Sequence, residues 1–192
     1  MSKPLRFTLA ALILGLTLGL GLPLLALAAD DTPVLSFRPA QAELQPGQTL
    51  TAEVWLENAP AIYGFEVHIT FDPAVLEVVD ADPAAPGIQI LPGDFISPSQ
   101  QSFTIRNQAD NVTGTLEYAI TLMNPAPPVS GTGRLFNIAF RAIAGGTAAV
   151  SITDRSLLGT RTGETIAPIR QDFQVTIRQW RFRVFMPNIM RP

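Results

Sequence analysis

The sequence predicts an all-β protein built as a two-sheet antiparallel β-sandwich. Apolar and polar residues alternate with a period of two in several stretches, and Pro, Gly, Asn and Asp separate these stretches. No stretch after residue 30 keeps a helical apolar period for three turns. Strands with one apolar and one polar face are typical of antiparallel sheets, so two such sheets are expected to pack face to face.

The first two strands are the most regular. The even positions of residues 50–56 are apolar, and so are the odd positions of residues 65–71. We expect both sets of side chains to face the core. Pro46-Gly47 opens the first strand, residues 58–60 are predicted to form the turn between the two, and Asp72-Pro73 ends the second.

The later strands are less uniform. Phe103 and Ile105 are expected in the core, as are the even, apolar positions of residues 116–120, and the two strands are joined by a turn at residues 110–114. Three prolines exclude residues 124–128 from a central strand. The apolar parity shifts by one among Leu135, Ile138 and Phe140, and a β-bulge near residue 136 or 137 would return all three to the core.

The two ends of the chain differ from the body. Residues 1–29 are predicted to be a secretory signal, because Lys3 and Arg6 precede the apolar run 7–22 and a small-residue cleavage pattern at 26–28. The alternative is an uncleaved membrane anchor. Either alternative predicts a secreted, extracellular or cell-surface body at residues 30–177. The basic, aromatic residues 178–192 form either a final edge strand or an attachment tail for an anionic envelope surface.

Composition and charge exclude several functions. The chain has no Cys and one His, which removes disulfides and thiol chemistry and disfavours His-based metal sites and proton relays. Residues 30–177 carry 7 Arg and 16 acidic residues, a net charge of −9, so nucleic acid is not an expected partner. The pair Asp80 and Asp82 lacks the ligand spacing of a calcium loop. We therefore expect no enzyme activity, no cofactor and no metal site.

Several segments resemble a cohesin domain. The segments are residues 44–48, 54–58, 62–79, 133–140 and 145–147, and the aromatic-Asp-Pro-x-x-Leu block that begins at Phe71 is the most specific of them. The resemblance spans residues 34–177. It implies a nine-stranded jelly-roll sandwich without catalytic activity. It also implies a dockerin-bearing partner, in which the dockerin carries the calcium, and an association with polysaccharide-degrading assemblies or the cell surface.

The resemblance also implies a binding surface on the outer side of one sheet. The residues expected there are Gly64, Glu66, His68, Arg106, Glu117, Thr121, Asn137 and Arg141. Many cohesins place Asn and Asp where this chain has Gly64 and Glu66. Glu66 keeps the negative charge, whereas Gly64 removes a hydrogen-bonding side chain.

Two other functions remain open from the residues alone. A carbohydrate-binding or adhesive module would use Trp55 and Tyr63 to stack on sugar rings, although Trp55 is as well explained by a covering segment. His68 is either a residue of the strand surface or the base of a catalytic triad. The sequence has no Gly-x-Ser-x-Gly nucleophile motif, which favours the first interpretation.

Overall fold

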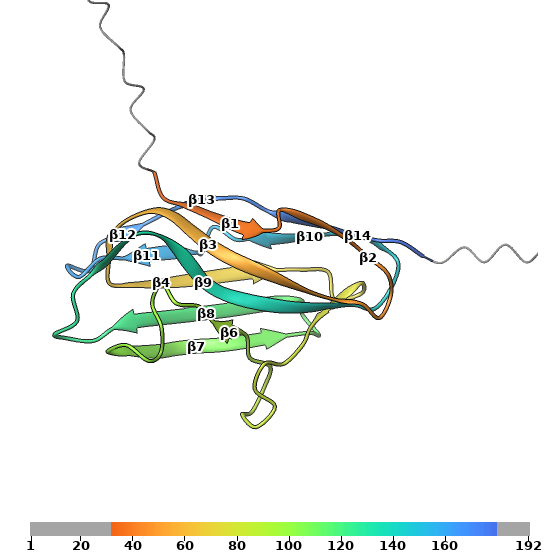
Figure 1. Ribbon diagram of the computed structural model, residues 1–192, viewed down its shortest axis with the longest axis horizontal. Coiled ribbons are helices and arrows are strands. Elements are labelled where there is room, and N and C mark those ends of the chain that lie inside the picture. Colours follow the sequence, from red (N-terminus) through yellow and green to blue (C-terminus); the bar gives the residue numbers. More distant parts are fainter. Residues whose placement is uncertain (1–31, 180–192) are drawn as a thin grey trace, which may run out of the picture. The chain divides into compact units, whose positions relative to one another are not determined.

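The computed structural model describes residues 32–179, which form two β-sheets packed face to face (Figure 1). The predicted signal segment and the tail from Trp180 onward lie outside these residues. No helix in the described part of the chain is long and apolar enough to cross a membrane. The strands are β1 (Val34–Arg38), β2 (Gln41–Leu44), β3 (Thr49–Ile62), β4 (Gly64–Thr70), β5 (Leu76–Val78), β6 (Leu91–Pro92), β7 (Ser102–Asp110), β8 (Thr115–Leu122), β9 (Val129–Ala142), β10 (Gly146–Ile152), β11 (Leu157–Gly159), β12 (Thr165–Ile166), β13 (Ile169–Arg170) and β14 (Phe173–Ile177).

The first sheet has the order β13-β1-β3-β9-β5, and β6 also pairs with β9. In the second sheet β4 is central: β8 and then β7 lie on one side of it. On its other side β4 pairs with β10 and β11 at different points along its length. The sheet continues through β14 to β2, and β12 extends β11. The predicted β-sandwich with jelly-roll topology is confirmed.

The pairing is antiparallel except at the N-terminal segment. β1 pairs in parallel with β13, and β2 pairs in parallel with β14. These pairings arise because the chain leaves the first sheet after β1 and enters the second sheet at β2. β1 and β2 are adjacent in the sequence but therefore contact C-terminal segments in different sheets. Such divisions raise the number of strand segments in the described residues above the nine that the family resemblance implied.

The core lies between the inner faces of the two sheets, as the alternation predicted for β3, β4 and β8. Aromatic pairs cross this interface, with ring centroids 5.2 Å apart for Tyr118 and Phe136 and 5.5 Å apart for Phe71 and Phe140. The predicted bulge in β9 is confirmed: Val54 pairs with Phe136 and Trp55 with Arg134, so Leu135 is the extra residue. Leu135, Ile138 and Phe140 are all buried.

Two local predictions are wrong. Residues 58–60 are not a turn, because β3 continues through them to Ile62 with an irregular register and a positive φ of 55° at Asn58. Phe103 and Ile105 are not in the core; they are 60% and 62% exposed. A register shift in β7 between Thr104 and Arg106 places Thr104, instead of its apolar neighbours, on the inner side.

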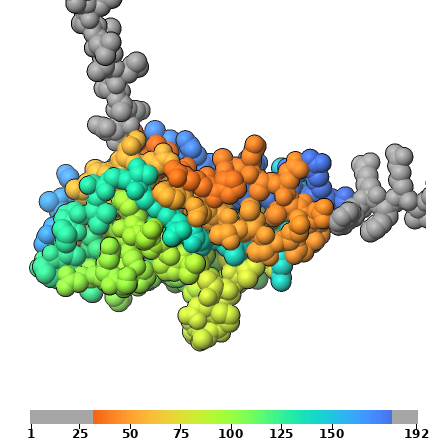
Figure 2. Space-filling view, in the orientation of Figure 1, coloured from red at the N-terminus to blue at the C-terminus, as the bar shows by residue number. Residues whose placement is uncertain are grey.

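The segment between β5 and β6 projects from the body of the sandwich (yellow-green in Figure 2). Asp80 and Asp82 lie in this segment. The Asp80 carboxylate accepts hydrogen bonds from the backbone N–H groups of Asp82 and Gln89, and the Asp82 carboxylate accepts one from Ala84. These contacts are those of acidic residues that stabilise turns.

Candidate functional site

The outer sides of β7, β8, β4 and β11 form one continuous surface, which we call the four-strand face. Strand register aligns its residues in rows across the sheet. Gly159, Gly64, Thr121 and Phe103 form one row, Leu157, Glu66, Ala119 and Arg106 form the next, and His68, Glu117 and Gln108 form the third. The face therefore changes from small and apolar at one end to charged at the other.

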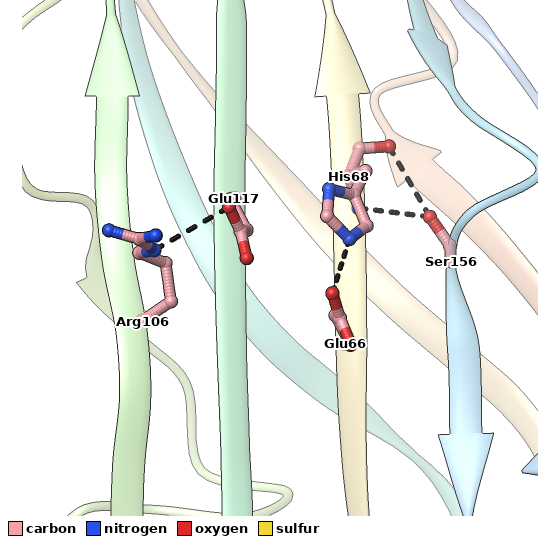
Figure 3. Close-up of polar contacts among 5 residues, drawn as sticks. All are labelled: Glu66, His68, Arg106, Glu117 and Ser156. Atoms are coloured by element: carbon pink, nitrogen blue, oxygen red, sulfur yellow. Dashed lines mark hydrogen bonds and ion pairs between the residues drawn. The ribbon is translucent and has the colours of Figure 1, made fainter.

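The charged end is a connected set of side chains (Figure 3). Glu66 Oε1 lies 2.5 Å from His68 Nε2, and Arg106 Nε lies 3.5 Å from Glu117 Oε2. His68 and Glu117 are directly paired across β4 and β8. The His68 side chain is only 10% exposed, whereas those of Glu66 and Glu117 are 46% and 35% exposed. Three of these residues, His68, Arg106 and Glu117, line a hollow of about 520 Å³ together with Asp154 and Arg155.

Ser156 forms hydrogen bonds with the backbone of His68 and not with its imidazole ring. The Ser156 hydroxyl oxygen accepts a hydrogen bond from the His68 backbone N–H at 2.9 Å and donates one to the His68 carbonyl at 3.3 Å. Ser156 is fully buried. A serine in this position contacts neither the imidazole nor solvent, so Ser156, His68 and Glu66 do not have the geometry of a Ser-His-acid nucleophile.

The other end of the four-strand face holds an apolar groove of about 280 Å³. Gly64, Ala119 and Gly159 belong to its lining and have little or no side chain, while Ile105 and Leu157 line it with larger apolar groups. A Cβ atom on Gly64 would lie 2.7 Å from the Ile120 carbonyl oxygen. The missing side chain at Gly64 is therefore imposed by the close approach of β8.

Six of the eight sequence-predicted surface residues share this face: Gly64, Glu66, His68, Arg106, Glu117 and Thr121. The expectation that Asn137 and Arg141 lie on neighbouring strands is wrong. Both are on β9, which pairs with β3 and β5 in the first sheet. Asn137 pairs there with Glu53, and Arg141 forms an ion pair with Glu77.

The two sugar-stacking candidates, Trp55 and Tyr63, lie in different parts of the sandwich, and each ring already contacts an arginine of the protein. Trp55 lies on the outer side of the first sheet, where the Arg38 guanidinium sits 4.0 Å from its ring centroid and its Nε1–H donates to Glu53 at 2.8 Å. Tyr63 lines the groove of the four-strand face, with the Arg161 guanidinium 5.4 Å from its ring centroid. A cation–π contact of this kind covers one face of the aromatic ring and leaves the other face for a sugar.

Sequence reasoning missed several residues of the four-strand face, namely Phe103, Ile105, Leu157 and Gly159. Simple alternation assigned Phe103 and Ile105 to the core, and no local pattern marked the bulge that turns them outward. Leu157 and Gly159 belong to a three-residue strand that is too short to show a period. Ala119 was recognised as an outward position of β8, but its role as groove lining depends on the strands beside it.

Two titratable groups near this sheet have shifted pKa values. A hydrogen bond from the Val112 backbone N–H, supported by the side chain and backbone of Thr113, holds the pKa of Asp110 below its usual range. Burial raises the pKa of Tyr118 to about 12, and the Thr104 side chain opposes this shift weakly. Asp110 thus remains ionised at the turn that ends β7, while Tyr118 remains protonated beneath the face.

Comparison with known proteins gives one family match. A family model described as the cohesin domain matches residues 36–177. Among curated proteins, a gellan lyase of a Bacillus species is 26% identical over 133 residues, which make up 67% of this chain. The chain spans about 5% of the length of that relative.

Solved structures share the fold at low sequence identity. A type II cohesin domain from the cellulosome of Acetivibrio cellulolyticus has a TM-score of 0.61 and 18% identity, covering 75% of this chain and 94% of that one. A type I cohesin–dockerin complex from Clostridium thermocellum has a TM-score of 0.57 and 16% identity, covering 77% and 99%. A complex of the third ScaC cohesin with the ScaB dockerin from A. cellulolyticus has a TM-score of 0.60 and 14% identity, covering 76% and 98%.

Proposed function

The chain belongs to the cohesin domain family, and from this premise we propose that it is a non-catalytic module whose four-strand face binds a dockerin-bearing protein. The observation that carries the proposal is the exposure of Phe103 and Ile105 on the outer side of β7. Large apolar side chains at 60% and 62% exposure favour a partner that removes them from water.

The composition of the four-strand face supports this choice of surface. Its apolar groove and its charged end lie side by side and share Glu117. Protein interfaces commonly combine an apolar centre with polar groups that fix orientation. The strands beneath are packed into the core, so little conformational entropy is lost when the face is covered. The structures of cohesin–dockerin complexes named above add support from the family.

The departure at Gly64 shapes the proposed contact. Gly64 has no side chain that could form a hydrogen bond with a partner, and it lines the apolar groove instead. We infer that a partner side chain enters the groove between Ile105 and Leu157, while Glu66 and Arg106 provide polar complementarity. The calcium of the complex is expected in the dockerin.

The cellular context is a further part of the proposal. The predicted signal at residues 1–29 supports an exported protein that acts outside the cell or at its surface. The similarity to part of a gellan lyase supports an association with polysaccharide breakdown. A direct carbohydrate-binding role is the alternative function, and it would use Trp55.

The test is a calorimetric titration of the full chain with each dockerin module encoded by the source genome, in the presence of calcium. We expect at least one to bind. Replacing Phe103 and Ile105 together by Ala should weaken that binding at least about tenfold, or about 1.4 kcal/mol, because buried aromatic contacts dominate interface energies.

A matched pair of arginine variants locates the interface. Arg106→Ala should weaken binding, whereas Arg141→Ala should not, because Arg141 lies on the other sheet. Both arginines are ion-paired and similarly exposed, at 51% and 54%. Failure of every dockerin to bind would contradict the proposal, as would equal effects of the two variants. Retention on an insoluble polysaccharide that is lost in Trp55→Ala would support the alternative.

A further inference from the structure

We propose that Glu66, His68 and Glu117 form a binding site for a divalent transition metal ion of the zinc type. One ligand atom from each residue, an imidazole nitrogen and two carboxylate oxygens, lies within 4.8 Å of the other two (Figure 3). No other group of this kind occurs among the residues that the structure describes. The site was not expected from the sequence, because only the pairing of β4 with β8 brings Glu117 to His68.

The donor set selects the class of metal. One imidazole nitrogen with two carboxylate oxygens suits zinc and its neighbours in the transition series, whereas calcium and magnesium prefer oxygen ligands alone. Zinc bonds of about 2.0–2.2 Å require donor atoms roughly 3.4 Å apart, a distance between the 2.5 Å of the Glu66–His68 contact and the 4.8 Å upper separation of the three donor atoms. The two carboxylates are half-exposed and can rotate, so that Glu66 moves away from His68 to admit the ion and the adjustment involves side chains only.

The fixed part of the site is the histidine. Its ring is nearly buried, and Ser156 bonds both its backbone N–H and its carbonyl, which fixes the strand position of His68. The ion would take the place of the hydrogen between His68 Nε2 and Glu66 Oε1, and the neutral imidazole would then carry its proton on Nδ1. A histidine held in this way loses little freedom on binding, which favours affinity.

Arg106 should lower the affinity of the site for a metal ion. Its guanidinium pairs with Glu117 Oε2 and leaves the other carboxylate oxygen for the metal. A nearby positive charge lowers the affinity for a cation. Three protein ligands also leave at least one coordination position for water. We therefore expect weaker binding than at a structural zinc site with four protein ligands.

The test uses zinc alone with the full chain, measured by calorimetry and by equilibrium dialysis with metal analysis. We expect one zinc ion per chain and much weaker binding of calcium. His68→Ala and Glu117→Gln should each weaken zinc binding at least about tenfold. Cobalt added in place of zinc should give visible absorption bands that His68→Ala abolishes.

Glu53→Gln is the matched control. Glu53 is 34% exposed and pairs with Arg134 at 3.4 Å, much as Glu117 is 35% exposed and pairs with Arg106 at 3.5 Å. It lies on the other sheet, so its variant should bind zinc normally. Absence of saturable zinc binding, calcium binding of equal strength, or zinc binding unchanged in Glu117→Gln would each overturn the proposal. No dockerin is present in these assays, so their outcome is independent of the proposed docking function.

Discussion

Tyr118 is the residue whose ionisation affects folding most clearly. It is fully buried, and its pKa is raised from 10.0 to about 12 because burial disfavours the phenolate. Above pH 10 the unfolded chain loses this proton at a lower pH than the folded chain does. The contribution of Tyr118 to the free energy of unfolding is therefore complete below pH 10 and is lost as the pH rises toward 12. A shift of this size corresponds to roughly 2 to 3 kcal/mol over the interval.

Tyr118→Phe should therefore reduce the alkaline loss of stability. At pH 7 we expect a change within about 1 kcal/mol, because the buried hydroxyl has no well-formed hydrogen bond to lose. The measurement is urea unfolding at pH 7 and at several values between pH 10 and 12. Tyr63→Phe, at the chain's other tyrosine, is the control and should retain the full alkaline loss. An identical pH profile for wild type and Tyr118→Phe would show that the assignment is wrong.

At the scale of strands, close packing of β4 against β8 determines the groove. Gly64→Ala should destabilise the protein by about 1–3 kcal/mol, because its Cβ would lie 2.7 Å from a backbone oxygen that cannot move alone. Gly159→Ala is the matched control on the same surface. Its Cβ would lie 3.8 Å from the nearest atom outside its neighbours, which is an ordinary contact. Thermal unfolding of both variants gives the comparison, and equal midpoints would contradict this account.

The same scale explains what the sequence could predict. Alternation identified β3, β4 and β8, because one side of each faces the core and the other faces water. It failed at β7, an edge strand whose inner side holds Asn107, bonded to the backbone of Ile90, instead of a run of apolar residues. A single bulge there turned Phe103 and Ile105 to the outside.

The sequence also could not predict which strands pair with one another. Alternation shows which residues share a face of a strand, but pairing depends on contacts between residues far apart in the chain. Arg141 was therefore given the correct outward direction and the wrong sheet. The apolar groove could not be predicted for the same reason, because its lining comes from five strands, β4, β7, β8, β11 and β12.

For the whole molecule, stability depends on the contact between the two sheets. Phe136 is fully buried, and its ring centroid lies 5.2 Å from that of Tyr118 on the opposite sheet. Phe136→Ala should cost about 3–5 kcal/mol, a large part of the stability of an ordinary domain. Phe103→Ala, the same change at an exposed position, should alter stability by less than about 0.5 kcal/mol. Urea unfolding of the two variants measures the difference, and similar losses would contradict the assignment of the core.

The parallel pairing of β2 with β14 has a mechanical consequence. β2 lies near the start of the described sequence and β14 lies at its end, and the two strands run in the same direction. The described chain therefore begins and ends at opposite ends of the sandwich (Figure 1). Tension applied between those ends acts along the strands, so their hydrogen bonds are sheared together and not unzipped one after another. We therefore expect a module arranged in this way to resist unfolding when a pulling force is applied between these two ends.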